Sequence, residues 1–100
     1  MEDFYFDGRS IHKSGGEYLG KIESNAICDA TGGELIWIKG NSVCNQYGTV
    51  IATVEKGSVL STSGGELSSM GNARRYFGNS NDTEDIYVAA AWMCFVKGIR

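Results

Sequence analysis

The feature that most constrains this chain is an internal repeat of sixteen residues. One glycine column contains Gly16, Gly32, Gly48 and Gly64. Three apolar columns keep the same spacing: Ile11, Ile27, Val43 and Val59; Leu19, Leu35, Ile51 and Leu67; and Phe6, Ile22, Ile38, Val54 and Met70. No insertion interrupts these columns, so the sequence predicts a repeat architecture in which each unit contributes the same local structure.

The length of the unit predicts a β-hairpin. Helix–turn–helix repeats need about 34 residues, whereas sixteen residues hold two strands of about five residues and two tight turns. In the second unit, residues 26–30 and 35–39 are expected to be strands. Gly32–Gly33 is expected to form a two-residue turn between them, because glycine adopts the positive φ angles that such turns need. Gly40–Asn41 is expected to form the next turn.

This register predicts an apolar girdle on one face of the sheet. Ile27 would pair with Ile38, and Ile38 with Val43, and the pattern would continue through every unit. The girdle contains Ile11, Ile22, Ile27, Ile38, Val43, Val54, Val59 and Met70, and the mixed opposite face carries His12, Lys21, Cys28, Trp37, Cys44, Thr53, Leu60 and Ser69. Four equal units favour closure around an axis on which the girdle converges as the core. An open twisted sheet is the alternative.

The end of the chain predicts one apolar helix. Residues 79–82 form a polar break, and a helix is expected over about 83–97, capped by Asp82 or Asn81. The alanines of 89–91 favour a helix over a strand. Because this segment is apolar on nearly all sides, it should pack on its own sheet or against a second copy of the chain. One domain is expected, with the hairpin repeats in 4–75 and the break and helix in 76–100.

The unit Ile27-Cys28-Asp29-Ala30-Thr31-Gly32-Gly33-Glu34-Leu35-Ile36, repeated four times, resembles the small bacterial proteins described as four-fold beta-flower domains. The alanine-rich stretch ending in Trp92 is also similar to that family. The resemblance covers about residues 4–96 and implies hairpins with pseudo-fourfold symmetry, but no activity, cofactor or catalytic residue. Asp29 is replaced at the equivalent positions by Lys13, Asn45 and Ser61, so a ring of identical polar groups is not expected.

Composition narrows the functional classes. A net charge of -3 with scattered basic residues argues against nucleic-acid binding. The longest apolar run, 86–96, is shorter than the roughly 20 residues of a membrane-spanning helix. The first residues lack the basic and apolar regions of a secretory signal. Three cysteines without a CxxC spacing favour a reducing compartment, so a cytoplasmic protein is expected.

The sequence contains no recognisable catalytic or cofactor-binding motif. His12, Cys28 and Cys44 share one column of successive units and are weak candidates for a zinc site, although the fourth position is Leu60. A nucleophilic pair between His12 and one of these cysteines is a weaker alternative. We therefore expect no enzyme, no catalytic residue, no cofactor and no assigned metal site. The leading prediction is a structural or protein-interaction module that associates with itself. The alternative is a domain that binds a small ligand or metal near the pseudo-symmetry axis.

Overall fold

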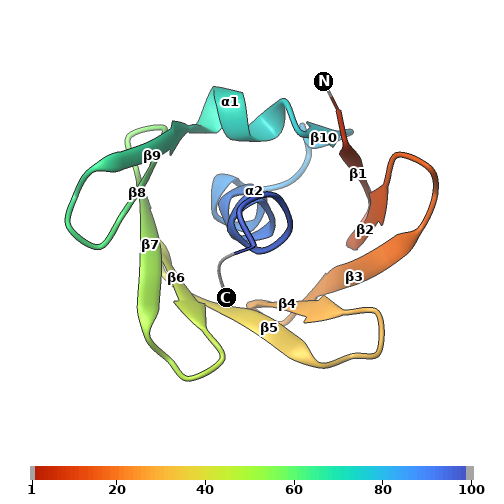
Figure 1. Cartoon of the computed structure of the whole chain (residues 1–100), viewed down its shortest axis with the longest axis horizontal. Helices are drawn as coiled ribbons and strands as arrows, with labels where there is room; N and C mark the ends of the chain where they lie inside the picture. Colours follow the sequence, from red (N-terminus) through yellow and green to blue (C-terminus); the bar gives the residue numbers. More distant parts are fainter. Residues whose placement is uncertain (1, 99–100) are drawn as a thin grey trace.

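A computed structural model describes residues 2–98 and shows a ten-stranded sheet curled around a C-terminal helix (Figure 1). The strands are β1 (Phe4–Asp7), β2 (Ser10–Lys13), β3 (Tyr18–Glu23), β4 (Ala26–Asp29), β5 (Glu34–Lys39), β6 (Ser42–Asn45), β7 (Val50–Glu55), β8 (Ser58–Leu60), β9 (Glu66–Ser69) and β10 (Phe77–Gly78). The helical elements are α1 (Met70–Arg74), α2 (Asp85–Ala91) and η1 (Trp92–Val96), a π-helical turn that continues α2. The prediction of a mainly β fold with a C-terminal helix is confirmed.

The sheet follows the chain from strand to strand. Its order is β10, then β1 through β9, with antiparallel neighbours except for the parallel pair β10 and β1. Phe77 on β10 stacks on Phe4 and Phe6 of β1, with ring centroids 5.3 and 5.1 Å apart. In the described chain β9 and β10 are the two ends of the sheet order, and α1 lies between them (Figure 1). The sheet is therefore curled but open, with a helix across the gap.

Backbone hydrogen bonds recur at sixteen-residue intervals. At residues 13, 29, 45 and 61, the N–H donates to the carbonyl four residues later and the carbonyl accepts from a glycine three residues later. At residues 22, 38, 54 and 70, the N–H donates to the carbonyl of residues 9, 25, 41 and 57, over 2.7 to 2.8 Å. The spacing of the sequence columns is therefore reproduced in the hydrogen bonds of the loops and tight turns.

The predicted two-residue turn at Gly32–Gly33 is wrong. The loop between β4 and β5 has four residues, 30–33. A register shift between Ile27 and Cys28 in β4 pairs Ile27 with Ile36 instead of Ile38. The physical reason is that backbone hydrogen bonds close the longer loop: the Asp29 N–H donates to the Gly33 carbonyl, and the Gly32 N–H donates to the Asp29 carbonyl. The Asp29 carboxylate adds hydrogen bonds from the N–H groups of Thr31 and Gly33. The tight turn at Gly40–Asn41 is confirmed, because Ile38 pairs with Val43 across it.

The shifted register brings a further column into the interior. This column pairs with the first column of the girdle, and all eight residues are buried. The pairs are Gly20 with Ile11, Ile36 with Ile27, Ala52 with Val43, and Ser68 with Val59. Of the remaining girdle residues, Ile22, Ile38 and Met70 are buried, whereas Val54 is only half-buried. The prediction of an apolar inner face is therefore correct for most of its members, but it omitted the second inner column.

The expectation that the girdle converges on the axis is wrong, because the helix occupies that place. Figure 1 shows α2 inside the curled sheet, and α2 contacts β4 to β7 as well as α1. Ala89, Ala90 and Ala91 have no exposed surface, and Trp92 is 3% exposed. Alanine side chains let strands approach a helix closely, which explains why an alanine-rich segment fits here. Within residues 2–98, no helix has the length and apolar character needed to cross a bilayer.

Two local predictions need correction. The region 4–75 also contains the helix α1, whose first residue is Met70 and whose N-cap Ser69 accepts a hydrogen bond from the Asn72 N–H. Asp82 or Asn81 was expected to cap the C-terminal helix, but Glu84 occupies the N-cap position without a side-chain cap. The helix begins later because the Arg74 guanidinium donates hydrogen bonds to the carbonyls of Ser80 and Thr83 and holds this segment in a non-helical path.

Candidate functional site

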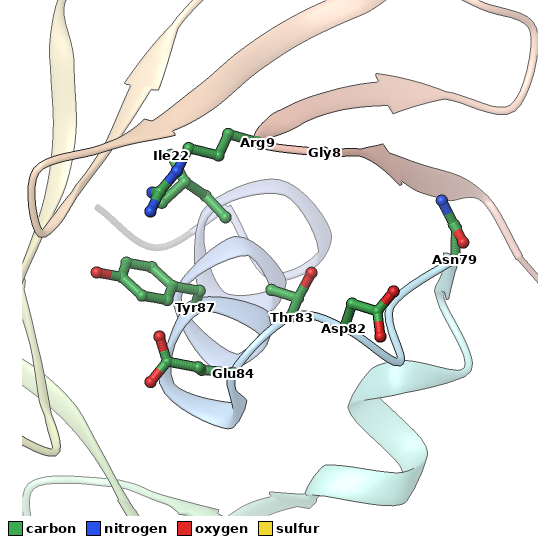
Figure 2. Close-up of a pocket in the computed structure, with 8 residues that line it drawn as sticks. All are labelled: Gly8, Arg9, Ile22, Asn79, Asp82, Thr83, Glu84 and Tyr87. Atoms are coloured by element: carbon green, nitrogen blue, oxygen red, sulfur yellow. The ribbon is translucent and has the colours of Figure 1, made fainter.

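A cleft opens where α2 enters the curled sheet. It has a volume of about 280 Å³ and is lined by Gly8, Arg9, Ile22, Asn79, Asp82, Thr83, Glu84 and Tyr87 (Figure 2). These residues come from four places: the turn between β1 and β2, the strand β3, the connection from β10 to α2, and the start of α2. We call this opening the mouth cleft. It lies at one end of the central helix and combines residues that are far apart in the sequence.

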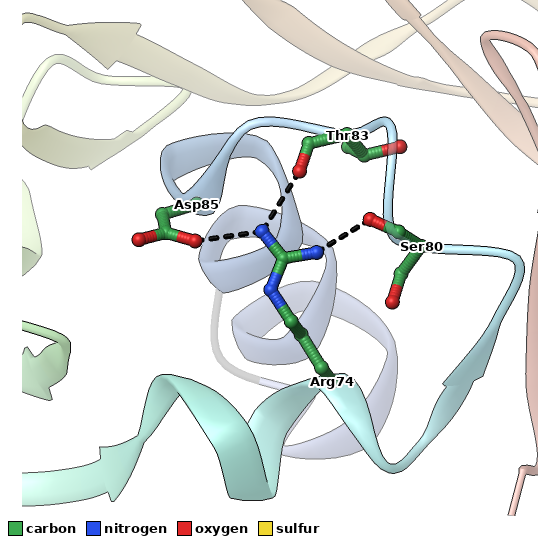
Figure 3. A network of polar contacts seen from close by, with 4 residues as sticks. All are labelled: Arg74, Ser80, Thr83 and Asp85. Atoms are coloured by element: carbon green, nitrogen blue, oxygen red, sulfur yellow. Dashed lines mark hydrogen bonds and ion pairs between the residues drawn. The ribbon is translucent and has the colours of Figure 1, made fainter.

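Arg74 on α1 fixes one wall of the mouth cleft. Its guanidinium donates hydrogen bonds to the carbonyls of Ser80 and Thr83, over 2.5 and 2.8 Å, and forms an ion pair of 2.6 Å with Asp85 (Figure 3). Asn79 has a φ of +60° and donates from its side chain to the carbonyl of Phe6 over 3.0 Å. These contacts hold the connection that carries Asp82 and Thr83 in a defined path.

The opposite wall is built from tight turns. Gly8 has a φ of +61°, a left-handed conformation that favours glycine, and it places Arg9 at the rim. The Arg9 carbonyl accepts a hydrogen bond from the Ile22 N–H over 2.7 Å. Tyr87 on α2 donates from its hydroxyl to the Asn25 side chain over 3.2 Å. The helix and the turns are thereby joined across the mouth.

The mouth cleft carries charges of both signs that are available to a ligand. The Arg9 guanidinium makes no hydrogen bond or ion pair with the described residues, and Figure 2 shows it extending over the opening beside Ile22. The carboxylates of Asp82 and Glu84 also lack such partners among residues 2–98. A cleft with an unpaired guanidinium and unpaired carboxylates can bind a ligand that has both an anionic and a cationic group.

The structure does not bring the weak zinc candidates together. His12 stacks on Tyr5 with ring centroids 5.0 Å apart and lies 5.5 Å from the Tyr18 ring. Cys28 is buried opposite Lys21 and Glu34, and Cys44 is buried opposite Trp37 on another hairpin. Across residues 2–98, no group of three or more histidine, cysteine or acidic side chains is placed to hold a metal ion.

The chemistry of Cys28 also opposes a nucleophilic role. Burial raises the pKa of its thiol, and the nearby carboxylates of Glu23 and Glu34 raise the pKa further. The thiolate is the nucleophilic form of cysteine, so a thiol with a raised pKa reacts weakly at neutral pH. The His12 imidazole faces tyrosine rings and the Gly16 carbonyl, 3.4 Å from its Nδ1. This geometry favours a packing role for both residues.

Sequence reasoning missed the residues of the mouth cleft. Arg9 sits in a turn whose column contains Asn25, Asn41 and Gly57, so the repeat conceals it among ordinary turn residues. The sequence pattern predicts Asp82 or Asn81 as a helix cap, not as part of a cleft. The useful signal was the position of Arg9 next to a glycine of the first tight turn, together with the acidic residues that precede the apolar helix.

No protein-family model, curated protein or solved structure matches this chain. The fold and the site therefore define it by themselves as an open β-hairpin ring around a helix, with a polar cleft at one mouth.

Proposed function

We propose that this protein is a non-catalytic binding module that holds a small zwitterionic ligand in the mouth cleft. The observation that carries the proposal is the unpaired Arg9 guanidinium in a cleft whose lining also includes the unpaired carboxylates of Asp82 and Glu84. An arginine binds a carboxylate through two parallel hydrogen bonds, and a carboxylate binds an ammonium group. Tyr87 adds an aromatic surface beside these groups.

The size of the mouth cleft fits such a ligand. Ligand sites in proteins usually have volumes of about 300–1,000 Å³, and the cleft of about 280 Å³ lies just below this range, which suits a small ligand. A free amino acid or a dipeptide has the required charges at this size. The walls are also held in place before binding, because Arg74 and Asn79 fix the connection and Tyr87 is tied to Asn25. A preformed site loses less conformational entropy on binding.

The test is calorimetric titration with a panel of free α-amino acids and the dipeptide valyl-glutamate. We expect saturable binding of at least one compound and a roughly tenfold or greater loss of affinity in Arg9→Ala, because a hydrogen-bonded charge contributes about 1.5–3 kcal/mol. Arg75→Ala is the matched control, since Arg75 is exposed and lies outside the cleft. Equal affinities of Arg9→Ala and the native protein, or no binding of any compound, would refute the proposal.

A second candidate function is a protein-interaction module that associates with itself. The specific observation is the hairpin of β6 and β7, where Tyr47 is 82% exposed and Val50 is 40% exposed. Aromatic residues are favoured in protein interfaces, and these two side chains give this hairpin an apolar tip. Sedimentation at increasing concentration should reveal association that Tyr47→Ser abolishes. Sedimentation as a monomer at every concentration would reject this candidate.

We also propose that the four hairpins are equivalent units with pseudo-fourfold symmetry, related to the four-fold beta-flower family. The support is the recurrence of the same loop and turn hydrogen bonds at sixteen-residue intervals.

The buried thiols of Cys28 and Cys44 support a cytoplasmic location, because a reducing compartment keeps thiols reduced. The net charge of -3 supports a role that does not involve nucleic acid.

A further inference from the structure

One further hollow adjoins the mouth cleft, and a second adjoins the first. The first notch, of about 480 Å³, is lined by Arg9, Ser10, Lys21, Ile22, Glu23, Ser24, Asn25 and Tyr87. The second notch, of about 260 Å³, is lined by Ser24, Asn25, Ala26, Glu34, Trp37, Ile38 and Lys39. The first notch shares Arg9, Ile22 and Tyr87 with the mouth cleft, and the second shares Ser24 and Asn25 with the first. The three hollows therefore lie in a row in which each shares lining residues with the next.

The two notches occupy equivalent positions of successive units. Five residues of the first notch have a counterpart sixteen residues later in the second notch. The pairs are Arg9 and Asn25, Ser10 and Ala26, Lys21 and Trp37, Ile22 and Ile38, and Glu23 and Lys39. Each notch lies between a tight turn and the end of the strand that donates a hydrogen bond to that turn. The repeat thus produces hollows at a regular interval and lines each with different side chains.

The charges along the row are not equally available. Glu23 is paired with Lys21 over 2.8 Å, and Glu34 accepts a hydrogen bond from the Trp37 indole over 2.8 Å. Arg9 and Lys39 have no hydrogen bond or ion pair with the described residues. Arg9 and Lys39 are therefore the charged side chains of the notches that have no partner among the described residues, whereas Glu34 keeps its negative charge beside the neutral indole. At the far end of the row, in the mouth cleft, Asp82 and Glu84 provide available negative charges.

The floor of the row is apolar. Ile22 is 4% exposed and Ile38 is 8% exposed, and each lines a notch between polar neighbours. The Trp37 ring borders the second notch and Tyr87 borders the first. A ligand that follows the row meets apolar surface below and charged groups at the sides.

We infer that the mouth cleft and the two notches form one groove for an extended peptide with acidic side chains. The peptide amino terminus lies at Asp82 and Glu84, acidic side chains bind Arg9 and Lys39, and apolar side chains rest on the isoleucine floor. This inference rests on the proposed function and extends the ligand beyond the mouth cleft. A nucleic acid strand, which is anionic throughout, would be repelled at the carboxylate end.

The probe is a hexapeptide of alternating valine and glutamate with a free amino terminus. Binding is measured by calorimetry and compared with that of valyl-glutamate, the N-acetylated hexapeptide, and a hexapeptide with lysine in place of glutamate. We expect the hexapeptide to bind roughly tenfold tighter than the dipeptide, and both modified hexapeptides to bind roughly tenfold more weakly than the parent. Trp37 fluorescence should change on addition of the hexapeptide, because Trp37 borders the second notch.

Lys39→Ala separates the groove from the mouth cleft. It should weaken hexapeptide binding roughly five- to tenfold and leave dipeptide binding unchanged, whereas Lys13→Ala, outside the row, should alter neither. The groove would be overturned if the hexapeptide bound no tighter than the dipeptide and Lys39→Ala had no effect on its affinity. If dipeptide binding still depended on Arg9, the proposed function would stand. Equal binding of the acetylated or the lysine hexapeptide would overturn the assigned charges. Binding of neither peptide through Arg9 would overturn both proposals.

Discussion

At the residue scale, three different side chains perform one task in the repeat. Asp29, Asn45 and Ser61 each accept a hydrogen bond from the backbone N–H four residues later. In the first unit the position is Lys13, where the backbone bonds of the loop remain. The side-chain acceptor therefore adds to backbone bonds that form without it, and three different side chains can supply it. Sequence comparison of the units suggested a broken polar ring, whereas the structure shows a shared loop geometry.

Asp29 should make stability depend on pH in the acidic range. The hydrogen bond from the Thr31 hydroxyl, together with the bond from the Gly33 N–H, lowers the pKa of its carboxyl group. A lowered folded-state pKa contributes stability above the unfolded pKa of about 4, and this contribution is lost as pH falls through the folded pKa. Asp29→Asn keeps the acceptor oxygen and removes the titration.

We therefore expect the Tm of the native protein to fall more steeply below about pH 4 than the Tm of Asp29→Asn. Thermal melts followed by circular dichroism between neutral and strongly acidic pH measure this difference. Other carboxyl groups titrate in both proteins, so only the difference between the two curves reports on Asp29. Parallel curves would contradict the assigned role.

At the element scale, the connection from β10 to α2 is the part that shapes the mouth cleft. Arg74 binds two carbonyls of this connection and Asp85 at the start of α2. Arg74→Ala should lower the free energy of unfolding by about 1–3 kcal/mol, because it removes charge-assisted hydrogen bonds from a half-buried group. It should also weaken binding in the mouth cleft, since Asp82 and Thr83 lose their support.

Arg75→Ala provides the control for this prediction. Arg75 is the adjacent residue, is exposed, and makes no side-chain hydrogen bond or ion pair with the described residues. Its removal should change the free energy of unfolding by less than about 0.5 kcal/mol. Denaturant unfolding of the two variants measures the difference, and equal losses would show that the Arg74 contacts do not stabilise the fold.

The strands and tight turns could be predicted from the sequence, but the longer loops could not. Apolar columns and the turn at Gly40–Asn41 specified the pairing of Ile38 with Val43. The pairing of Ile27 with Ile36 follows from a four-residue loop closed by backbone hydrogen bonds, and the glycine column does not distinguish this loop from a two-residue turn. The mouth cleft was also not predictable, because it depends on how Arg74 arranges a distant connection.

At the scale of the whole molecule, the sheet and the helix complete each other. The inner columns of the sheet face α2, and Val88, Ala89, Ala90 and Ala91 have no exposed surface. The apolar run of 86–96, which could have joined two subunits, is instead enclosed by its own chain (Figure 1). A curled sheet without its central helix would expose the girdle to water, at a large cost in free energy.

Deletion of residues 83–100 tests this arrangement most directly, with circular dichroism and sedimentation as the readouts. Because the helix supplies the centre of the core, the shortened protein should lose its cooperative melting transition and its sheet signal, or aggregate. A shortened protein that stays soluble, keeps the sheet signal and melts at the native temperature would contradict the central position of the helix and, with it, the existence of the mouth cleft.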